Sequence, residues 1–338
     1  MFIHKYDDII SVENLLISWQ EFLRGKKKRN DVILFQSKLM NNIFDLHNDL
    51  KNKTYKHGQY EAFKINDPKP RDIHKASVRD RLLHHAIYRI LYPYFNKKFI
   101  YDSYSCRLGK GTHRAIYRFE KFQRIVSQNN TKTCSILKCD IRKFFANIDH
   151  DFLKEILQKH IQDENILWLL SQVIDSFHTP CVRQDLTQDN PIGWSYGVGL
   201  PLGNLTSQIL VNIYMNEFDQ FVKHKLRIKY YIRYADDFVI LSPDKIILLN
   251  LLKQMKEFLE NNLKLNMHRD KVFIKTIFSG VDFLGWVHFP KHRVLRTSTK
   301  KRMFRNIKKN KKPNTLASYL GMLSHGNGYK LKEKIISL

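Results

Sequence analysis

The chain has 338 residues, of which 43% are hydrophobic and 12% aromatic, so it can bury a substantial core and does not have a disordered composition. Its 58 lysines and arginines exceed its 32 aspartates and glutamates, and the net charge of +26 indicates a polyanionic partner, either nucleic acid or an anionic membrane surface. No apolar run approaches the roughly 18 residues of a membrane span, and the first ten residues do not form a signal peptide. We therefore expect nucleic acid as the partner and no membrane.

Cysteines and histidines give no indication of a zinc centre. The four cysteines include no C-x-x-C pair, and the 15 histidines are scattered apart from one adjacent pair. Reduced thiols and the lack of targeting signals favour a cytoplasmic location.

The first third of the chain is predicted to be mainly helical. Residues 10–50 have a helical pattern that is interrupted by the basic cluster at 24–29, and a second helix is predicted over Val78–Phe95. Between them, the polar stretch Asn66–Arg71 predicts a hairpin turn. Cys106–Ala115 has two glycines and three basic residues and leads into a further helix, but it lacks the spacing of a nucleotide-triphosphatase phosphate loop.

The middle of the chain alternates between strands and helices. A strand is predicted over Cys134–Asp140, and Asp149 opens a helix whose apolar residues continue to Ile161. Residues 180–198 are rich in proline and glycine and predict loops. Asn204 is then expected to cap a long helix.

The segment Tyr230–Leu241, YYIRYADDFVIL, predicts two strands of a tight hairpin with Asp236 and Asp237 at or beside the turn. A solvated turn pair is one interpretation of these acids, because aspartate is favoured in turns. The other interpretation involves Asp140, which ends the earlier strand. Two neighbouring strands that end in carboxylates can hold two Mg²⁺ ions, and a basic chain with such a site would be a nucleotidyl transferase.

The remaining chain is predicted to contain a helix over Ile246–Leu263, strands near Phe273 and over Phe283–Phe289, and a basic helical tail. Lys291–Lys312 contains eleven lysines or arginines and no acid. The overall pattern indicates an α+β protein with an antiparallel centre.

Several motifs, taken in order, resemble those of reverse transcriptases. They are KPRDIHKASVRDR (Lys69–Arg81), CDIRKFFANIDH (Cys139–His150), GLPLGNLTSQ (Gly199–Gln208), YADD (Tyr234–Asp237) and DFLGW (Asp282–Trp286). The resemblance implies a right-hand polymerase with fingers, a palm containing an antiparallel sheet, and a short helical thumb. It implies fingers with N-terminal helices over 1–125, a palm over 126–290 from which about 155–198 return to the fingers, and a thumb over 291–338.

Within this family the chain is most similar to reverse transcriptases of diversity-generating retroelements, because Leu202-Gly203 and Ser207-Gln208 replace the Gln-Gly and Ser-Pro of intron enzymes. Such an enzyme would make mutagenic, adenine-directed cDNA from a template-repeat RNA in a bacterium or phage. Two alternatives remain open: another bacterial reverse transcriptase, of antiviral or intron-derived type, or a non-catalytic RNA-binding protein on a polymerase scaffold.

The resemblance also implies roles for individual residues. The Mg²⁺ ligands would be Asp140, the Ile141 carbonyl, Asp236 and Asp237, of which the three aspartates are the catalytic residues. The deoxynucleotide would be bound by Lys69, Arg71, Phe145, Gly203 and Gln208, with Phe145 excluding a 2′-hydroxyl. Leu202 and Gln208 would belong to a loop that controls fidelity, and Lys271 is a candidate general acid. The primer grip would consist of Phe283, Gly285 and Trp286.

The partners implied by this family are an RNA template, a DNA or RNA primer, deoxynucleotides and a small, basic, helical accessory variability protein. Two Mg²⁺ ions would be the cofactors. The basic tail would contact phosphates without reading sequence.

Overall fold

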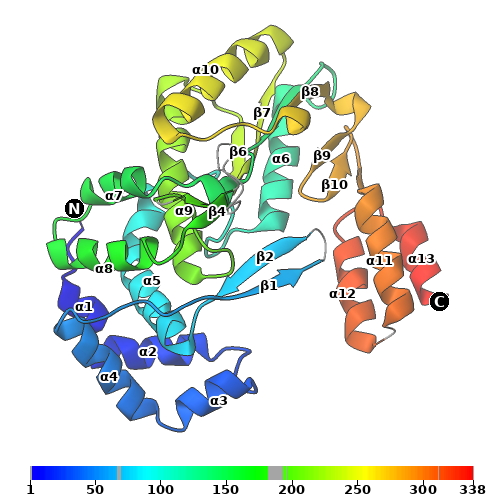
Figure 1. Ribbon diagram of the computed structural model, residues 1–338. Coiled ribbons are helices and arrows are strands. Elements are labelled where there is room, and N and C mark those ends of the chain that lie inside the picture. Colours follow the sequence, from blue (N-terminus) through cyan, green and yellow to red (C-terminus); the bar gives the residue numbers. More distant parts are fainter. Residues whose placement is uncertain (1, 67–69, 182–192, 196, 311, 338) are drawn as a thin grey trace. The chain divides into compact units, whose positions relative to one another are not determined.

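The computed structural model describes residues 2–66, 70–181, 193–195, 197–310 and 312–337 (Figure 1). The chain divides into two compact units. The first unit comprises Met1–Ile100, Arg142–Gln220 and Phe258–Asn266, and the second comprises Tyr101–Ile141, Phe221–Glu257 and Met267–Leu338. None of the helices in the described ranges is long and apolar enough to cross a membrane.

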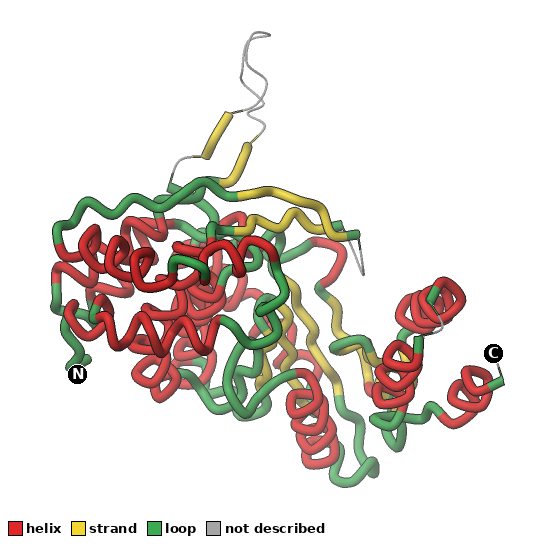
Figure 2. The backbone as a smooth tube through the Cα atoms, turned by 90° about the horizontal axis from the view of Figure 1, so that it is seen from below, coloured by secondary structure: helices red, strands yellow, loops and turns green. Residues whose placement is uncertain are grey.

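The first unit is mostly helical (Figure 2). Its helices are α1 (Tyr6–Ile10), α2 (Val12–Phe22), α3 (Asn30–Gln36), α4 (Leu39–Lys51), α5 (Val78–Lys98), α7 (His150–Gln158), α8 (Glu164–Ile174) and α9 (Leu205–Gln220), with a 3-10 turn at Phe144–Asn147. Side chains cap several of their first turns: Ser77 accepts a hydrogen bond from the Asp80 amide, and Asp149 accepts one from the Phe152 amide.

Helix α5 lies at the centre of this unit. It packs against α2 and α9, and buried residues occur around most of its circumference, as expected for a helix that has little contact with solvent. The predicted helix over Val78–Phe95 is confirmed. Pro93 does not end it, and it continues three residues beyond Phe95, to Lys98.

Two antiparallel hairpins complete the first unit: β1 (Glu61–Ile65) with β2 (Arg71–Lys75), and β4 (Thr179–Cys181) with β5 (Gly193–Ser195). The pairing of Ile65 with Arg71 agrees with the predicted turn, although residues 67–69 lie outside the described residues.

Two local predictions in this unit are wrong. Asn204 precedes α9, but its Oδ1 accepts no hydrogen bond within the described structure, and its Nδ2 instead donates to the His74 carbonyl at 2.9 Å. The helix that Asp149 opens ends at Gln158, before Ile161, and α8 follows as a separate helix. In the case of Asn204, a long-range partner has replaced the local cap.

The second unit is built on a four-stranded antiparallel sheet with the strand order β6-β7-β3-β8, which confirms the predicted antiparallel centre. The strands are β3 (Ser135–Asp140), β6 (Tyr231–Tyr234), β7 (Asp237–Ser242) and β8 (Phe273–Thr276). The central pair is in register from Ser135 opposite Ser242 to Asp140 opposite Asp237. The carboxylate-bearing ends of β3 and β7 therefore lie side by side.

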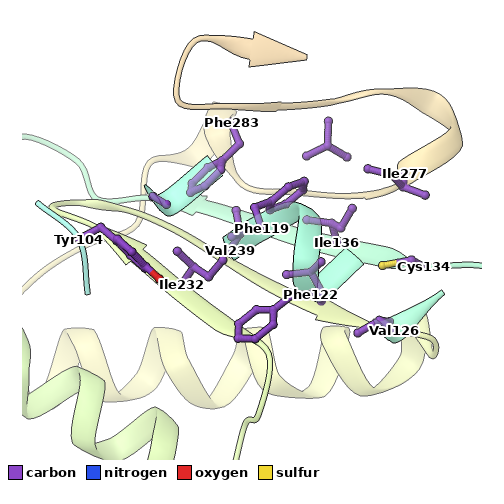
Figure 3. Close-up of a cluster of buried hydrophobic side chains, with 13 residues drawn as sticks. Tyr104, Phe119, Phe122, Val126, Cys134, Ile136, Ile232, Val239, Ile277 and Phe283 are labelled. Carbon is purple, nitrogen blue, oxygen red and sulfur yellow. The ribbon is translucent and has the colours of Figure 1, made fainter. Parts of the chain in front are cut away.

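Helix α6 (Thr112–Val126) covers one face of this sheet and buries an apolar cluster against it (Figure 3). Phe119 and Phe122 of α6 meet Ile136, Ile232 and Val239 of the three neighbouring strands, and all five side chains are buried. Burial of this many large apolar groups makes the sheet a rigid support for the residues at its ends.

The remainder of the second unit contains the first part of helix α10 (Lys245–Leu263), whose residues from Phe258 onward belong to the first unit. It also contains a second sheet with the order β11-β10-β9. Its strands are β9 (Val281–Phe283), β10 (Trp286–His288) and β11 (Arg293–Leu295), and helices α11 (Thr297–Lys309), α12 (Pro313–Leu323) and α13 (Tyr329–Ile336) follow. The tail predicted to be helical from Lys291 therefore begins with a strand, because β11 pairs with β10.

The three C-terminal helices form a buried cluster with Trp286 and Leu295, to which they contribute Met303 and Ile307 of α11, Leu323 of α12 and Ile335 of α13. The contact with Trp286 requires glycine at position 326, because a Cβ atom there would lie 2.1 Å from the indole ring.

Candidate active site

The hairpin between β6 and β7 presents two of the three predicted catalytic aspartates. Tyr234 pairs with Asp237, so Ala235 and Asp236 form a two-residue turn, and Ala235 has a positive φ of 57°. Asp237 is the first residue of β7 and lies opposite Asp140, the last residue of β3. The structure thus brings Asp140, Asp236 and Asp237 together at one end of the sheet.

A buried arginine holds the turn from within the unit. The Arg233 guanidinium is fully buried, and it donates to the Ala235 carbonyl at 3.1 Å and to the Ser103 hydroxyl at 3.2 Å. Its backbone also pairs with the segment around Ser103, because the Arg233 amide donates to the Asp102 carbonyl and its carbonyl accepts from the Tyr104 amide. The position of Asp236 is therefore fixed by side-chain and backbone contacts.

Backbone hydrogen bonds also fix the end of β3. The Ile141 amide donates to the Asp236 carbonyl at 3.2 Å, and the Asp140 carbonyl accepts from the His268 amide at 2.8 Å. Ile141, whose carbonyl is a predicted metal ligand, thus continues from the strand into direct contact with the turn formed by Ala235 and Asp236.

Two lysines contact these carboxylates. Lys271 Nζ lies 2.8 Å from Asp140 Oδ1, and Lys138 Nζ lies 3.1 Å from Asp237 Oδ2. Lys271 was predicted from the sequence, but Lys138 was missed. Its position in the sequence could have indicated this contact. Lys138 lies two residues before Asp140 on the same strand, and alternate residues of a strand share a face.

Asp237 has unusual electrostatics. The pKa of its carboxyl group is raised to about 7, mainly by burial and also by the neighbouring charges of Asp236 and Asp140, although Lys138 opposes the rise. Its Oδ1 atom is buried and has no hydrogen-bond partner in the described structure. Such an oxygen is a suitable partner for a cation.

These residues fit divalent metal ions whose coordination is completed by substrate. Within the described ranges, no three His, Cys, Asp or Glu side chains form a ready-made metal cage. Mg²⁺ does not need one, because it is commonly held by one or two carboxylates and fills its remaining positions with water and substrate phosphates. The unpartnered Asp237 oxygen next to two further carboxylates agrees with that mode of binding.

The residues predicted to bind the nucleotide belong to the first unit. Arg71 is an exposed residue of β2, and Phe145 is a half-buried residue of the 3-10 turn. The Phe145 carbonyl accepts a hydrogen bond from the Leu200 amide at 2.8 Å, and the Leu202 carbonyl accepts one from the His74 amide at 3.0 Å. The 3-10 turn, β2 and the predicted fidelity loop are thus joined through the backbone.

Gly203 and Gln208 complete this group. Gly203 has a φ of 108°, and a Cβ atom there would lie 2.9 Å from Ile73, so a side chain would be strained and crowded. Gln208 lies in the first turn of α9 and is half-buried. Lys69 lies outside the described residues.

The predicted primer grip is a second tight hairpin. Phe283 pairs with Trp286 across Leu284 and Gly285, which have positive φ angles of 50° and 87°. The Phe283 and Trp286 side chains are both buried, the first against α6 and the second against the C-terminal helices. Their side chains thus contribute packing, and the turn between them is the more accessible part.

Comparison with known proteins identifies the family. The family model described as "Reverse transcriptase (RNA-dependent DNA polymerase)" matches residues 56–288. Protein YkfC of Escherichia coli K12 is 26% identical over 282 residues, which cover 73% of this chain and 70% of YkfC. The group II intron-encoded protein LtrA of Lactococcus lactis subsp. cremoris is 24% identical over 304 residues, which cover 71% of this chain but only 47% of LtrA.

A solved structure supports the fold. Telomerase from Candida albicans, solved with a fragment of telomeric RNA, superposes with a TM-score of 0.51 at 12% identity over 73% of this chain and 48% of the telomerase chain. The predicted right-hand polymerase fold is confirmed. The family model also confirms the predicted enzyme class of RNA-directed DNA polymerases. Because the family model matches more than half of the chain, this chain belongs to the reverse transcriptase family.

Proposed function

We propose that this chain synthesises DNA on an RNA template, with Asp140, Asp236 and Asp237 as its catalytic carboxylates. The observation that carries this proposal is the register of the palm sheet, which sets Asp140 opposite Asp237 and puts Asp236 in the adjoining turn. The net charge of +26 supports nucleic acid as template and primer.

The proposed cofactors are two Mg²⁺ ions held by the Asp140 and Asp236 carboxylates and the Ile141 carbonyl, with Asp237 as a weaker ligand or an electrostatic support. When bound, such ions would supply the activation of the attacking oxygen and the stabilisation of the leaving oxygen that phosphoryl transfer requires. The chain itself supplies the rigid sheet end that keeps the carboxylates in place. Lys271, close to Asp140, is the candidate proton donor to the leaving group.

The other proposed roles concern nucleotide and primer. Arg71 and Lys69 would contact the triphosphate, since an arginine fork suits phosphate oxygens. Phe145 would exclude a 2′-hydroxyl, while Gly203 and Gln208 would lie beside the nucleotide. The Phe283–Trp286 hairpin would support the primer. Fingers over 1–125, palm over 126–290 and thumb over 291–338 remain the proposed division.

For the subtype, we propose a diversity-generating retroelement enzyme that copies a template-repeat RNA into mutagenic cDNA together with a small basic accessory protein. Leu202 and the Ser207-Gln208 pair support this subtype. An intron-derived enzyme is the second candidate, favoured by the similarity to LtrA. Copying one RNA and sequencing the cDNA separates them, because errors concentrated at template adenines are expected only for the first.

The catalytic proposal is tested by primer extension on an RNA template with Mg²⁺. Asp236→Asn should abolish DNA synthesis and leave the folded state and RNA binding largely unchanged. Asp270→Asn is the matched control, because the Asp270 side chain is 90% exposed and the same chemical change there should preserve synthesis. Appreciable synthesis by Asp236→Asn would falsify the assignment.

A further inference from the structure

Lys138 is a buried lysine on a central strand. It lies on β3 between Val239 of β7 and Phe273 of β8, and its side chain is only 9% exposed. A buried ammonium group is costly unless a counter-charge accompanies it. That counter-charge is Asp237, whose Oδ2 lies 3.1 Å from Lys138 Nζ.

The two lysines at the site differ in how firmly they are held. Lys271 belongs to a short 3-10 turn (Arg269–Lys271), and its side chain is 39% exposed, so it can swing away from Asp140. Lys138 cannot withdraw in the same way, because its backbone is paired on both sides and its side chain is enclosed. The pairing with Asp237 is therefore a lasting feature of the sheet.

We propose that Lys138 is a positioning residue that holds Asp237 by one oxygen and compensates its charge. Divalent cations are then attracted mainly by the carboxylates of Asp140 and Asp236, while Asp237 offers its Oδ1 atom without adding a third full negative charge. This inference rests on the proposed function of the three carboxylates as a metal site.

Charge compensation predicts opposite effects for the two single substitutions. Lys138→Met removes a positive charge beside the three carboxylates, so divalent cations should bind about tenfold more tightly. Asp237→Asn removes negative charge and leaves the ammonium group in place, so they should bind about tenfold more weakly. The double variant removes both charges, and its Kd should return to within about twofold of the parent value. If the contact had only a structural role, the two single substitutions would not shift the Kd in opposite directions.

The measurement is Mn²⁺ binding to the full chain without template, primer or nucleotide, followed by electron paramagnetic resonance. Binding that disappears in Asp236→Asn defines the signal from the site. Lys275→Met is the matched control, because Lys275 is an exposed lysine on the adjacent strand β8 and its loss changes the net charge equally. The double variant also protects against misfolding, since removing both members of a buried pair costs less than removing one.

The outcomes separate this inference from the function on which it rests. If no Mn²⁺ binding depends on Asp236, the proposed metal site fails and the inference fails with it. If such binding is present but Lys138→Met leaves its Kd unchanged, weakens it, or shifts it no more than Lys275→Met does, only the role of Lys138 is overturned. Opposite shifts that cancel in the double variant support the inference.

Discussion

Replacing Arg233 with methionine tests whether the buried guanidinium holds the turn formed by Ala235 and Asp236. The substitution keeps the length of the side chain but removes its hydrogen bonds to the Ala235 carbonyl and the Ser103 hydroxyl. Each of these buried groups left without a partner costs about 1–3 kcal/mol, and part of the total is recovered because the charge no longer has to be desolvated. We therefore expect the free energy of opening this turn to fall by about 3 kcal/mol.

Hydrogen exchange measured by mass spectrometry reports this change directly. A loss of about 3 kcal/mol raises the population of the locally open state about 100-fold, so amides in the peptide over 231–238 should exchange faster by that factor. Arg305→Met, at an exposed position on α11, is the matched control and should leave this peptide unchanged. If Arg233→Met accelerates exchange less than about fivefold, the turn is held by its backbone pairing alone and our account of Arg233 is wrong.

Three further predictions concern the nucleotide site and the basic tail. Phe145→Ala should increase ribonucleotide incorporation, because it removes the ring that is proposed to exclude the 2′-hydroxyl; unchanged selectivity in competition assays would leave Phe145 with a packing role only. Leu202→Gln should lower misincorporation at template adenines, because glutamine can form a polar contact that leucine cannot. A tenfold change in misincorporation requires only about 1.4 kcal/mol of discrimination between correct and incorrect pairs. Identical error spectra would show that the infidelity arises outside the loop. Neutralising four basic residues of α11 should flatten the slope of log affinity against log salt for RNA by up to about three, since each phosphate contact contributes about 0.7 on single strands. The same neutralisation within the basic cluster at 24–29 is the comparison, and an equal slope for parent and α11 variant would show that those charges face solvent.

Local patterns in the sequence were sufficient to predict the strands and the turn that carry the three carboxylates. The apolar run before Asp140 and the alternating segments around Asp236 and Asp237 predicted β3 and the β6–β7 hairpin, because strand alternation and turn chemistry are short-range properties. The order of the motifs then led to the family, which the comparison confirmed. The roles of the individual site residues stay predictions until the proposed variants are measured.

Tertiary structure decided which partners these residues have. Asn204 has the residue type and position of a helix cap, yet its amide donates to His74, which is 130 positions away. The basic stretch after Lys291 has helical composition, but its first residues form β11 because the edge of β10 is available for pairing. Lys138 and Arg233 look like ordinary cations of a very basic chain, and only the packed sheet encloses them and pairs Lys138 with Asp237. Such pairs are invisible to local patterns because they join residues distant in sequence, and their strength arises from the low-dielectric interior that exists only after folding.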